Sequence, residues 1–191
     1  MPATRHGRPR PEKAADLLAI AQRLFLERGY NGTTMAAIAD EAGVASNVVH
    51  WYFPSKDELF AKALEELQIR GLDELLDRQL ARATPGEEKK TLEEVLTRLV
   101  WDALDSHHLI ATVHERSSQS EVIDALHERA HRCYAHYLGR AVSRCGVPQA
   151  KRELVVEVLS TALEGLVMHR ASKRKARRMI SFLVERLTAE P

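Results

Sequence analysis

The sequence predicts an all-α protein of about nine helices, and three observations support this. Leu, Ala, Glu and Arg abound, whereas the 191 residues include only 9 Gly, 7 Pro and 5% aromatic residues, a mix that favours helices. Apolar residues recur at i, i+3 and i+4 along most of the chain. No segment has the convincing period-two alternation of a strand, and the sequence contains no internal repeat.

Composition narrows the class of protein further. Hydrophobic residues make up 45% and charged residues 29% of the chain, and the net charge is only +1, so the whole chain is not a polycation. No run of about 18 apolar residues predicts a membrane span, and no apolar signal core is present near residue 1. We therefore expect a cytoplasmic protein with no membrane partner, built as one medium domain or as a small domain plus a larger one.

The chain is organised around residues 34–53, which have the pattern of two short helices joined by a tight turn. The first helix is predicted at about 34–41, and Gly43 in the turn can adopt the left-handed conformation that ends a helix. The second is predicted at about 45–53. Its outward face near the N-terminus consists of Ser46, Asn47, Val48 and His50. A helix-turn-helix protein needs this arrangement, because the first turns of its second helix enter the DNA major groove.

Further helices are predicted on either side of this motif. The first spans about Pro11 to Arg28. Ser55 and Glu58 form a capping box at the start of a fourth helix, which is expected to reach about residue 83 and to bend at Gly71. The remaining helices are predicted at about 91–106, 108–116, 121–144, 148–172 and 174–188.

Two stretches carry a resemblance to a known family. They are Ile38-Ala39-x-x-Ala42-Gly43-Val44 and the run Trp-Tyr-Phe-Pro-Ser-Lys-Asp-Glu-Leu-Phe that ends at Phe60. From about Lys13 to Phe60 the chain resembles the N-terminal domain of the TetR/AcrR family of transcriptional regulators. This resemblance implies a DNA-binding domain at residues 11–70 and an effector-binding and dimerisation domain at residues 71–191.

The resemblance implies a DNA-binding regulator, expected to be a repressor that a small-molecule effector releases. Family members touch the phosphate backbone at the positions of Thr34, Trp51, Tyr52 and Lys56, and Thr33 joins the expected DNA contacts. The outward residues Ser46, Asn47, Val48 and His50 are expected to enter the groove. The operator sequence does not follow from the family, because this chain departs from the common family residues at Ala45, Asn47 and His50.

Family members act as homodimers that pair their last two long helices across a two-fold axis, which implies a palindromic operator. The apolar faces of the last two helices of this chain suit that role. The expected interface residues are Leu154, Val158, Ala162, Leu163, Leu166, Ile180, Leu183 and Leu187.

A candidate effector pocket comes from large or polar side chains within otherwise apolar helices, since ligand pockets are mostly apolar with a few polar groups. The side chains of this kind are Trp101, His107, His108, His114, His131, Tyr134, Tyr137, Met168 and His169. Six of them form the expected pocket: Trp101, His108, His131, Tyr134, Met168 and His169. The sequence does not name the effector.

The run from His127 to His131 matches the H-E-x-x-H pattern of zinc proteases, in which two histidines bind zinc and Glu128 would be the general base. A small helical zinc metalloenzyme is therefore the alternative hypothesis. It needs a third ligand, and Glu153 lies downstream at a tolerable distance, but on a helix beyond a proline turn. No Gly-rich phosphate loop, G-x-S-x-G elbow or Cys-x-x-Cys pair is present. The sequence thus favours a regulator that is not an enzyme and needs no metal or cofactor, over both the metalloenzyme and a helical interaction module without a DNA role.

Two basic segments leave alternatives open. Arg5, Arg8, Arg10 and Lys13 form either an arm that contacts DNA or a solubilising tail. The cations of residues 170–178 form either a second nucleic-acid contact or a solvated turn.

Overall fold

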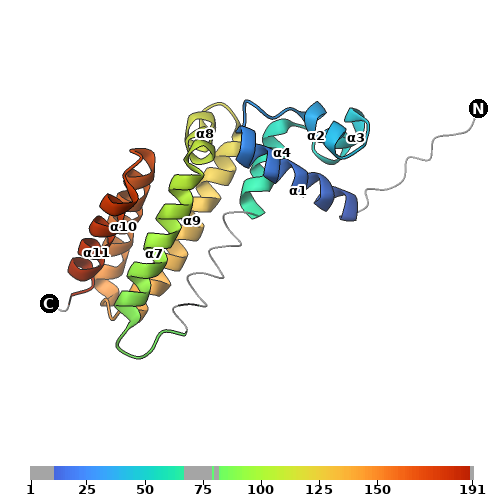
Figure 1. The fold of residues 1–191 in the computed structure, drawn as a ribbon. Coiled ribbons are helices and arrows are strands. Elements are labelled where there is room, and N and C mark those ends of the chain that lie inside the picture. The colour runs from blue at the N-terminus through green and yellow to red at the C-terminus, as the bar shows by residue number, and fades with distance from the viewer. Residues whose placement is uncertain (1–10, 67–78, 80–81, 190–191) are drawn as a thin grey trace, which may run out of the picture.

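The computed structural model describes residues 11–66, 79 and 82–189 (Figure 1). Within these residues the chain forms nine helices and no strand, as the sequence predicted. The helices are α1 (Pro11–Arg28), α2 (Met35–Glu41), α3 (Ser46–Tyr52), α4 (Lys56–Leu64), α7 (Glu88–Asp105), α8 (His107–Ser117), α9 (Glu121–Arg144), α10 (Gln149–Met168) and α11 (Lys173–Leu187). The predicted continuation of the fourth helix and its bend at Gly71 fall mainly outside the described residues.

Local signals in the sequence define the helix-turn-helix. Thr34 caps α2, because its Oγ1 accepts a hydrogen bond from the backbone N–H of Ala37. Gly43 has φ +62°, a conformation that costs glycine little and that turns the chain from α2 into α3. Ser55 Oγ accepts a hydrogen bond from the N–H of Glu58 and caps α4. The helices α2 and α4 therefore begin at a hydroxyl side chain that caps them, and a glycine makes the turn that follows α2.

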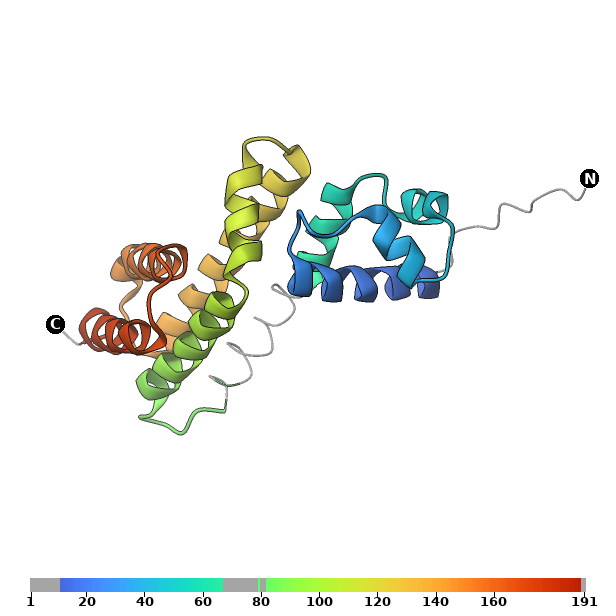
Figure 2. The ribbon, with the colours of Figure 1, turned by 45° about the horizontal axis from the view of Figure 1, so that its top comes forward.

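A first hydrophobic core holds α1 to α4 together. Phe25, Tyr30 and Phe60 are at its centre, and Phe60 meets both other rings edge to face, with ring centroids 4.9 and 5.0 Å apart. Leu109 and Val113 of α8 and Ile123 and Leu126 of α9 belong to the same core. The helix-turn-helix module is thus packed directly on α8 and α9, on one side of the helical body (Figure 2).

A second core joins α7, α9, α10 and α11. The helix α10 packs on α9, and α11 packs on α7, so the four long helices form the body seen at the left of Figure 1. Its buried residues include Leu92, Leu96, Leu138, Leu159 and Ile180. None of the described helices has both the length and the apolar character that a membrane span requires.

Candidate functional site

The outer face of α3 presents polar side chains to solvent. Ser46, Asn47 and His50 are exposed and Val48 is half-buried, while Val49 is fully buried against the first core. Val49 thus holds the helix to the module, while the side chains of Ser46, Asn47 and His50 face solvent. An exposed helix of this kind has the geometry that enters a major groove.

Asn47 is not the residue that caps α3. The N-cap position is held by Ala45, which makes no side-chain hydrogen bond to the helix. Asn47 lies within the first turn, and its side chain is exposed. Its amide is therefore placed to meet a partner outside the chain.

The predicted phosphate contacts lie at the start of α2, at the end of α3 and at the start of α4. Thr34 is exposed at the start of α2, and Trp51 is 46% exposed at the end of α3, edge to face with Tyr52 at 5.0 Å between ring centroids. Lys56 begins α4, and its Nζ lies 3.9 Å from the centre of the Tyr30 ring. Burial, and then the nearby charge of Arg116, lower the pKa of Lys56.

The assignment of Thr33 to the DNA contacts is wrong, because this residue is fully buried. Its Oγ1 donates to the carbonyl oxygens of Leu24 and Gly29, at 3.1 and 2.9 Å. The hydroxyl therefore ties the end of α1 to the loop before α2, and it cannot reach DNA. Of the two adjacent threonines, only Thr34 faces outward.

A network of hydrogen bonds joins the helix-turn-helix module to the body. The carboxylate of Asp57, in the first turn of α4, accepts hydrogen bonds from Tyr30 and from Arg116 of α8. Burial disfavours the ionised carboxylate, but the hydrogen bonds from Arg116, Tyr30 and Ser120 outweigh it and lower the pKa of Asp57. Burial, and then the bond to Asp57, raise the pKa of Tyr30 to about 12. A second link pairs Glu65 with Arg129 of α9 at 3.4 Å.

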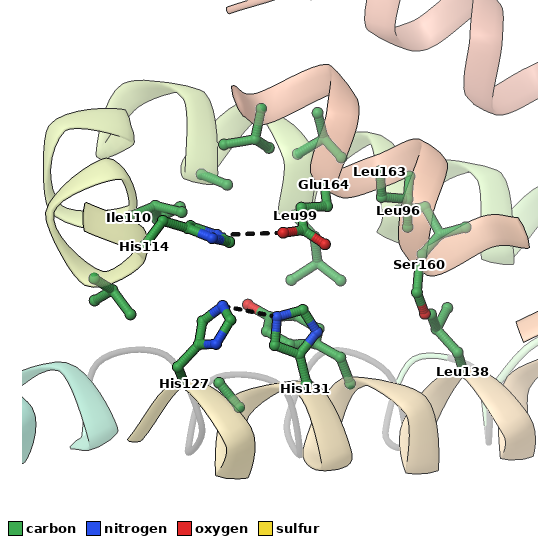
Figure 3. Close-up of a pocket in the computed structure, with 16 residues that line it drawn as sticks. Leu96, Leu99, Ile110, His114, His127, His131, Leu138, Ser160, Leu163 and Glu164 are labelled. Atoms are coloured by element: carbon green, nitrogen blue, oxygen red, sulfur yellow. Dashed lines mark hydrogen bonds and ion pairs between the residues drawn. The ribbon is translucent and has the colours of Figure 1, made fainter. Parts of the chain in front are cut away.

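The body contains a pocket of about 150 Å³ between α7, α8, α9 and α10 (Figure 3). Its wall is mostly apolar and includes Leu96, Leu99, Ile110, Leu138 and Leu163. The polar residues that line it are His114, His127, His131, Tyr134, Ser160 and Glu164. Burial raises the pKa of Tyr134 to about 12, and the Oγ of Ser160 is buried without a hydrogen-bond partner in the described part of the chain.

Only two of the six predicted pocket residues, His131 and Tyr134, line this pocket. Trp101 instead donates from Nε1 to the carbonyl of Lys173, which joins α7 to α11. His108 lies 3.4 Å from the carbonyl oxygen of Phe25, at the end of α1. Met168 and His169 lie at the end of α10, outside the lining. These four side chains therefore lie outside the lining of this pocket, because residue type alone does not give the direction of a side chain on its helix.

The polar end of the pocket brings together side chains from three helices. His127 and His131 of α9 have their Nε2 atoms 3.0 Å apart, and Nε2 of His114 on α8 lies 3.3 Å from the Glu164 carboxylate on α10. Figure 3 shows all four side chains turned toward one another. The sequence pattern found the pair on α9 but could not place Glu164 beside it.

Glu128 does not take the position that the metalloenzyme hypothesis gives it. Its side chain is 61% exposed and pairs with Arg132 at 3.5 Å, and it is not part of the pocket lining. Glu153, the other residue invoked, is exposed near the start of α10. The general base of that hypothesis is therefore turned away from the histidines.

A family model described as bacterial regulatory proteins, tetR family, matches residues 17–63, which include the whole helix-turn-helix. The chain is also 29% identical over 103 residues to the HTH-type transcriptional repressor KstR2 of Rhodococcus jostii, a match that covers 54% of this chain and 48% of that protein. The helix-turn-helix segment, residues 17–63, thus belongs to the TetR family.

Two further proteins show how far the likeness extends. The HTH-type transcriptional activator FasR of Mycolicibacterium smegmatis is 37% identical over 84 residues, or 43% of this chain and 36% of FasR. The chain thus matches less than half the length of either relative. A TetR transcription regulator from Haloarcula marismortui has the same fold, with a TM-score of 0.76 over 92% of this chain and 97% of that one, at 20% identity.

The expected dimer face of the chain needs correction. Leu166 and Ile180 are buried within the protomer, and Leu163, Leu183 and Leu187 pack against its second core. Ala162 is half-buried. Leu154 and Val158 have exposed fractions of 64% and 37%, so both are accessible to a second copy of the chain. Met179 and Phe182 are exposed to a similar extent, and the sequence interpretation missed them.

The structure describes only one of the two basic segments in full. Residues 5–10 lie outside the described part of the chain, whereas Lys13 is half-buried in α1. In the second segment, Lys173 pairs with Asp105 at 2.8 Å and lies over the Trp101 ring. At least one of its cations thus contributes to the packing of α11 on α7.

Proposed function

We propose that this chain is a sequence-specific DNA-binding transcriptional regulator. The observation that carries the proposal is the free outer face of α3, with Ser46, Asn47 and His50 exposed while Val49 anchors the helix. The family membership of the helix-turn-helix segment supports the same function. We assign residues 11–70 to DNA binding and residues 71–191 to effector binding and dimerisation.

The residues around α3 divide into two kinds of contact. Asn47 can pair with adenine through two hydrogen bonds, and Val48 can contact a thymine methyl group. His50 and Ser46 complete the groove-facing set. Thr34, Trp51, Tyr52 and Lys56 surround this face and bind phosphates, which position the protein without reading sequence.

The regulator acts as a homodimer on a palindromic operator. Leu154 and Val158 of α10 and Met179 and Phe182 of α11 are large apolar side chains exposed on the two helices that family members pair. Burying them against a second copy would remove apolar surface from water, which is favourable. A two-fold dimer presents two copies of α3, so the half-sites lie about one or more helical turns apart.

The pocket in the body binds the effector, and the regulator is a repressor that the effector releases in the cytoplasm. A volume of about 150 Å³ is similar to that of apolar cavities that hold benzene, which points to a compact ligand. Its apolar part would contact the leucine walls, and a polar group would meet Ser160 or the histidines. Release requires that the effector bind the DNA-free conformation more tightly.

Selection of bound fragments from random duplex DNA tests this function. The purified full-length protein should enrich a palindrome, and its affinity should fall with added salt because phosphate contacts release counterions. The double variant Asn47→Ala with His50→Ala serves as the inactive control, and Arg98→Ala, on the exposed side of α7, as the active one. Enrichment of no motif by the wild-type protein would contradict the proposal.

A further inference from the structure

The polar end of the pocket has an unusual composition for an apolar cavity. Three imidazoles cluster there, with ring centroids of His114 and His127 4.6 Å apart and those of His127 and His131 4.4 Å apart. One carboxylate, that of Glu164, faces them from α10. Three neighbouring imidazolium ions would repel one another, and one carboxylate compensates only a single positive charge.

Neutral imidazoles, by contrast, are metal ligands. Nitrogen and carboxylate donors suit zinc and its neighbours in the first transition row. The cluster therefore has the chemistry of a divalent cation site.

The geometry agrees with this chemistry. One ligand atom each from His114, His127 and Glu164 can be chosen so that all three lie within 4.8 Å of one another. Ligands about 2.0–2.1 Å from a tetrahedral zinc ion lie roughly 3.3 Å apart. The His114–Glu164 pair, at 3.3 Å, and the His127–His131 pair, at 3.0 Å, already have such separations.

We propose that His114, His127 and Glu164 bind a divalent transition-metal ion, with zinc as the reference ion, and that His131 supplies a fourth ligand. The site holds α8, α9 and α10 together, because each helix contributes at least one ligand. It is a regulatory site and not a catalytic one, since Glu128 is turned to solvent and paired with Arg132.

A regulatory consequence follows, and this part rests on the proposed DNA-binding function. His114 lies two residues before Arg116, which binds Asp57 at the start of α4. An ion that fixes His114 against α9 and α10 therefore fixes the segment of α8 that contacts the helix-turn-helix module. Zinc would change operator affinity through this contact.

Zinc binding to tag-free, chelator-treated full-length protein tests the site directly. Calorimetry should show one ion per protomer, and cobalt in place of zinc should give the strong visible bands of a tetrahedral site. His127→Ala, His114→Ala and Glu164→Gln should each lower zinc affinity by more than roughly tenfold, because loss of even an outer partner of a ligand has that effect. His136→Ala, an exposed histidine of the same helix, and Glu128→Gln should bind zinc like the wild type.

The outcomes separate the two proposals. Absence of zinc uptake by the wild-type protein, or equal uptake by variants whose helical circular dichroism is unchanged, would overturn the metal site whatever the protein does on DNA. Zinc binding with unchanged operator affinity would overturn the regulatory consequence alone. Zinc binding by a protein that selects no DNA motif would support the site and contradict the proposed function.

Discussion

Arg116 of α8 donates a hydrogen bond to Asp57 of α4, with 2.9 Å between Nη2 and Oδ2. Both side chains are about three-quarters or more buried, at 27% and 19% exposure. The pair joins the helix that carries His114 to the helix that follows α3.

Arg116→Ala should lower the free energy of unfolding by roughly 1–3 kcal/mol, because Asp57 loses a hydrogen bond to a charged partner. Arg98→Ala removes an exposed i, i+4 pair with Asp102 and should cost at most about 0.5 kcal/mol. Urea unfolding of both variants gives the comparison. Equal stability of the two would mean that the Arg116–Asp57 pair contributes nothing beyond a surface ion pair.

Acid should remove the contribution of Asp57 to stability. Its pKa is lowered in the folded protein from an ordinary value of 3.8, so the stabilisation is full above the unfolded value and is lost as the pH falls through the folded value. The stability difference between wild type and Asp57→Asn should therefore shrink as the pH falls below about 4. Urea titrations at several pH values measure it, and a difference that grows on acidification would have the wrong sign.

Thr33→Val should destabilise the protein without changing how a folded molecule binds DNA. The variant leaves the buried carbonyls of Leu24 and Gly29 without the Thr33 hydroxyl, at a cost of roughly 1–3 kcal/mol. Thr34→Ala instead removes the α2 cap and an expected phosphate contact, and should weaken both stability and DNA binding. Melting temperature and DNA affinity, measured on both variants, separate these roles. A loss of affinity in fully folded Thr33→Val would restore the residue to the DNA-binding set.

Leu154→Glu combined with Phe182→Glu should give a folded monomer, since both side chains are exposed in the protomer and charges are costly in an apolar interface. Leu26→Glu, at an exposed leucine of α1, is the matched control and should remain dimeric. Sedimentation velocity measures whether each variant is a monomer or a dimer. A double variant that still sediments as a dimer would place the interface elsewhere.

The sequence predicted most of the local structure, because local signals determine it. The bounds of α1 and α9 agree with the predicted ones, and the turn at Gly43 and the cap at Ser55 are where the sequence indicated. Each of these features depends on residues a few positions apart. Helical periodicity and capping chemistry were sufficient for them.

Tertiary placement was harder to predict, as single pairs of residues show. Thr33 and Thr34 are adjacent and chemically identical, yet one is buried and the other faces solvent. Ile180 belongs to the protomer core while Phe182 is exposed, although apolar character made Ile180 the candidate for the interface. Glu164 of α10 contacts His114 of α8, and the spacing of residues in the sequence does not predict this contact.

The claim that α3 reads bases is tested most directly by measuring DNA affinity. The proteins are the wild type, Asn47→Ala and Lys56→Ala, and the DNAs are the selected operator, its single-base variants and random DNA. Asn47→Ala should lose about 1–3 kcal/mol on the operator and relax preference at one position per half-site, whereas Lys56→Ala should weaken binding to every sequence and reduce the salt slope by about one unit. Equal loss on every DNA for Asn47→Ala would contradict the claim that α3 reads bases through this residue.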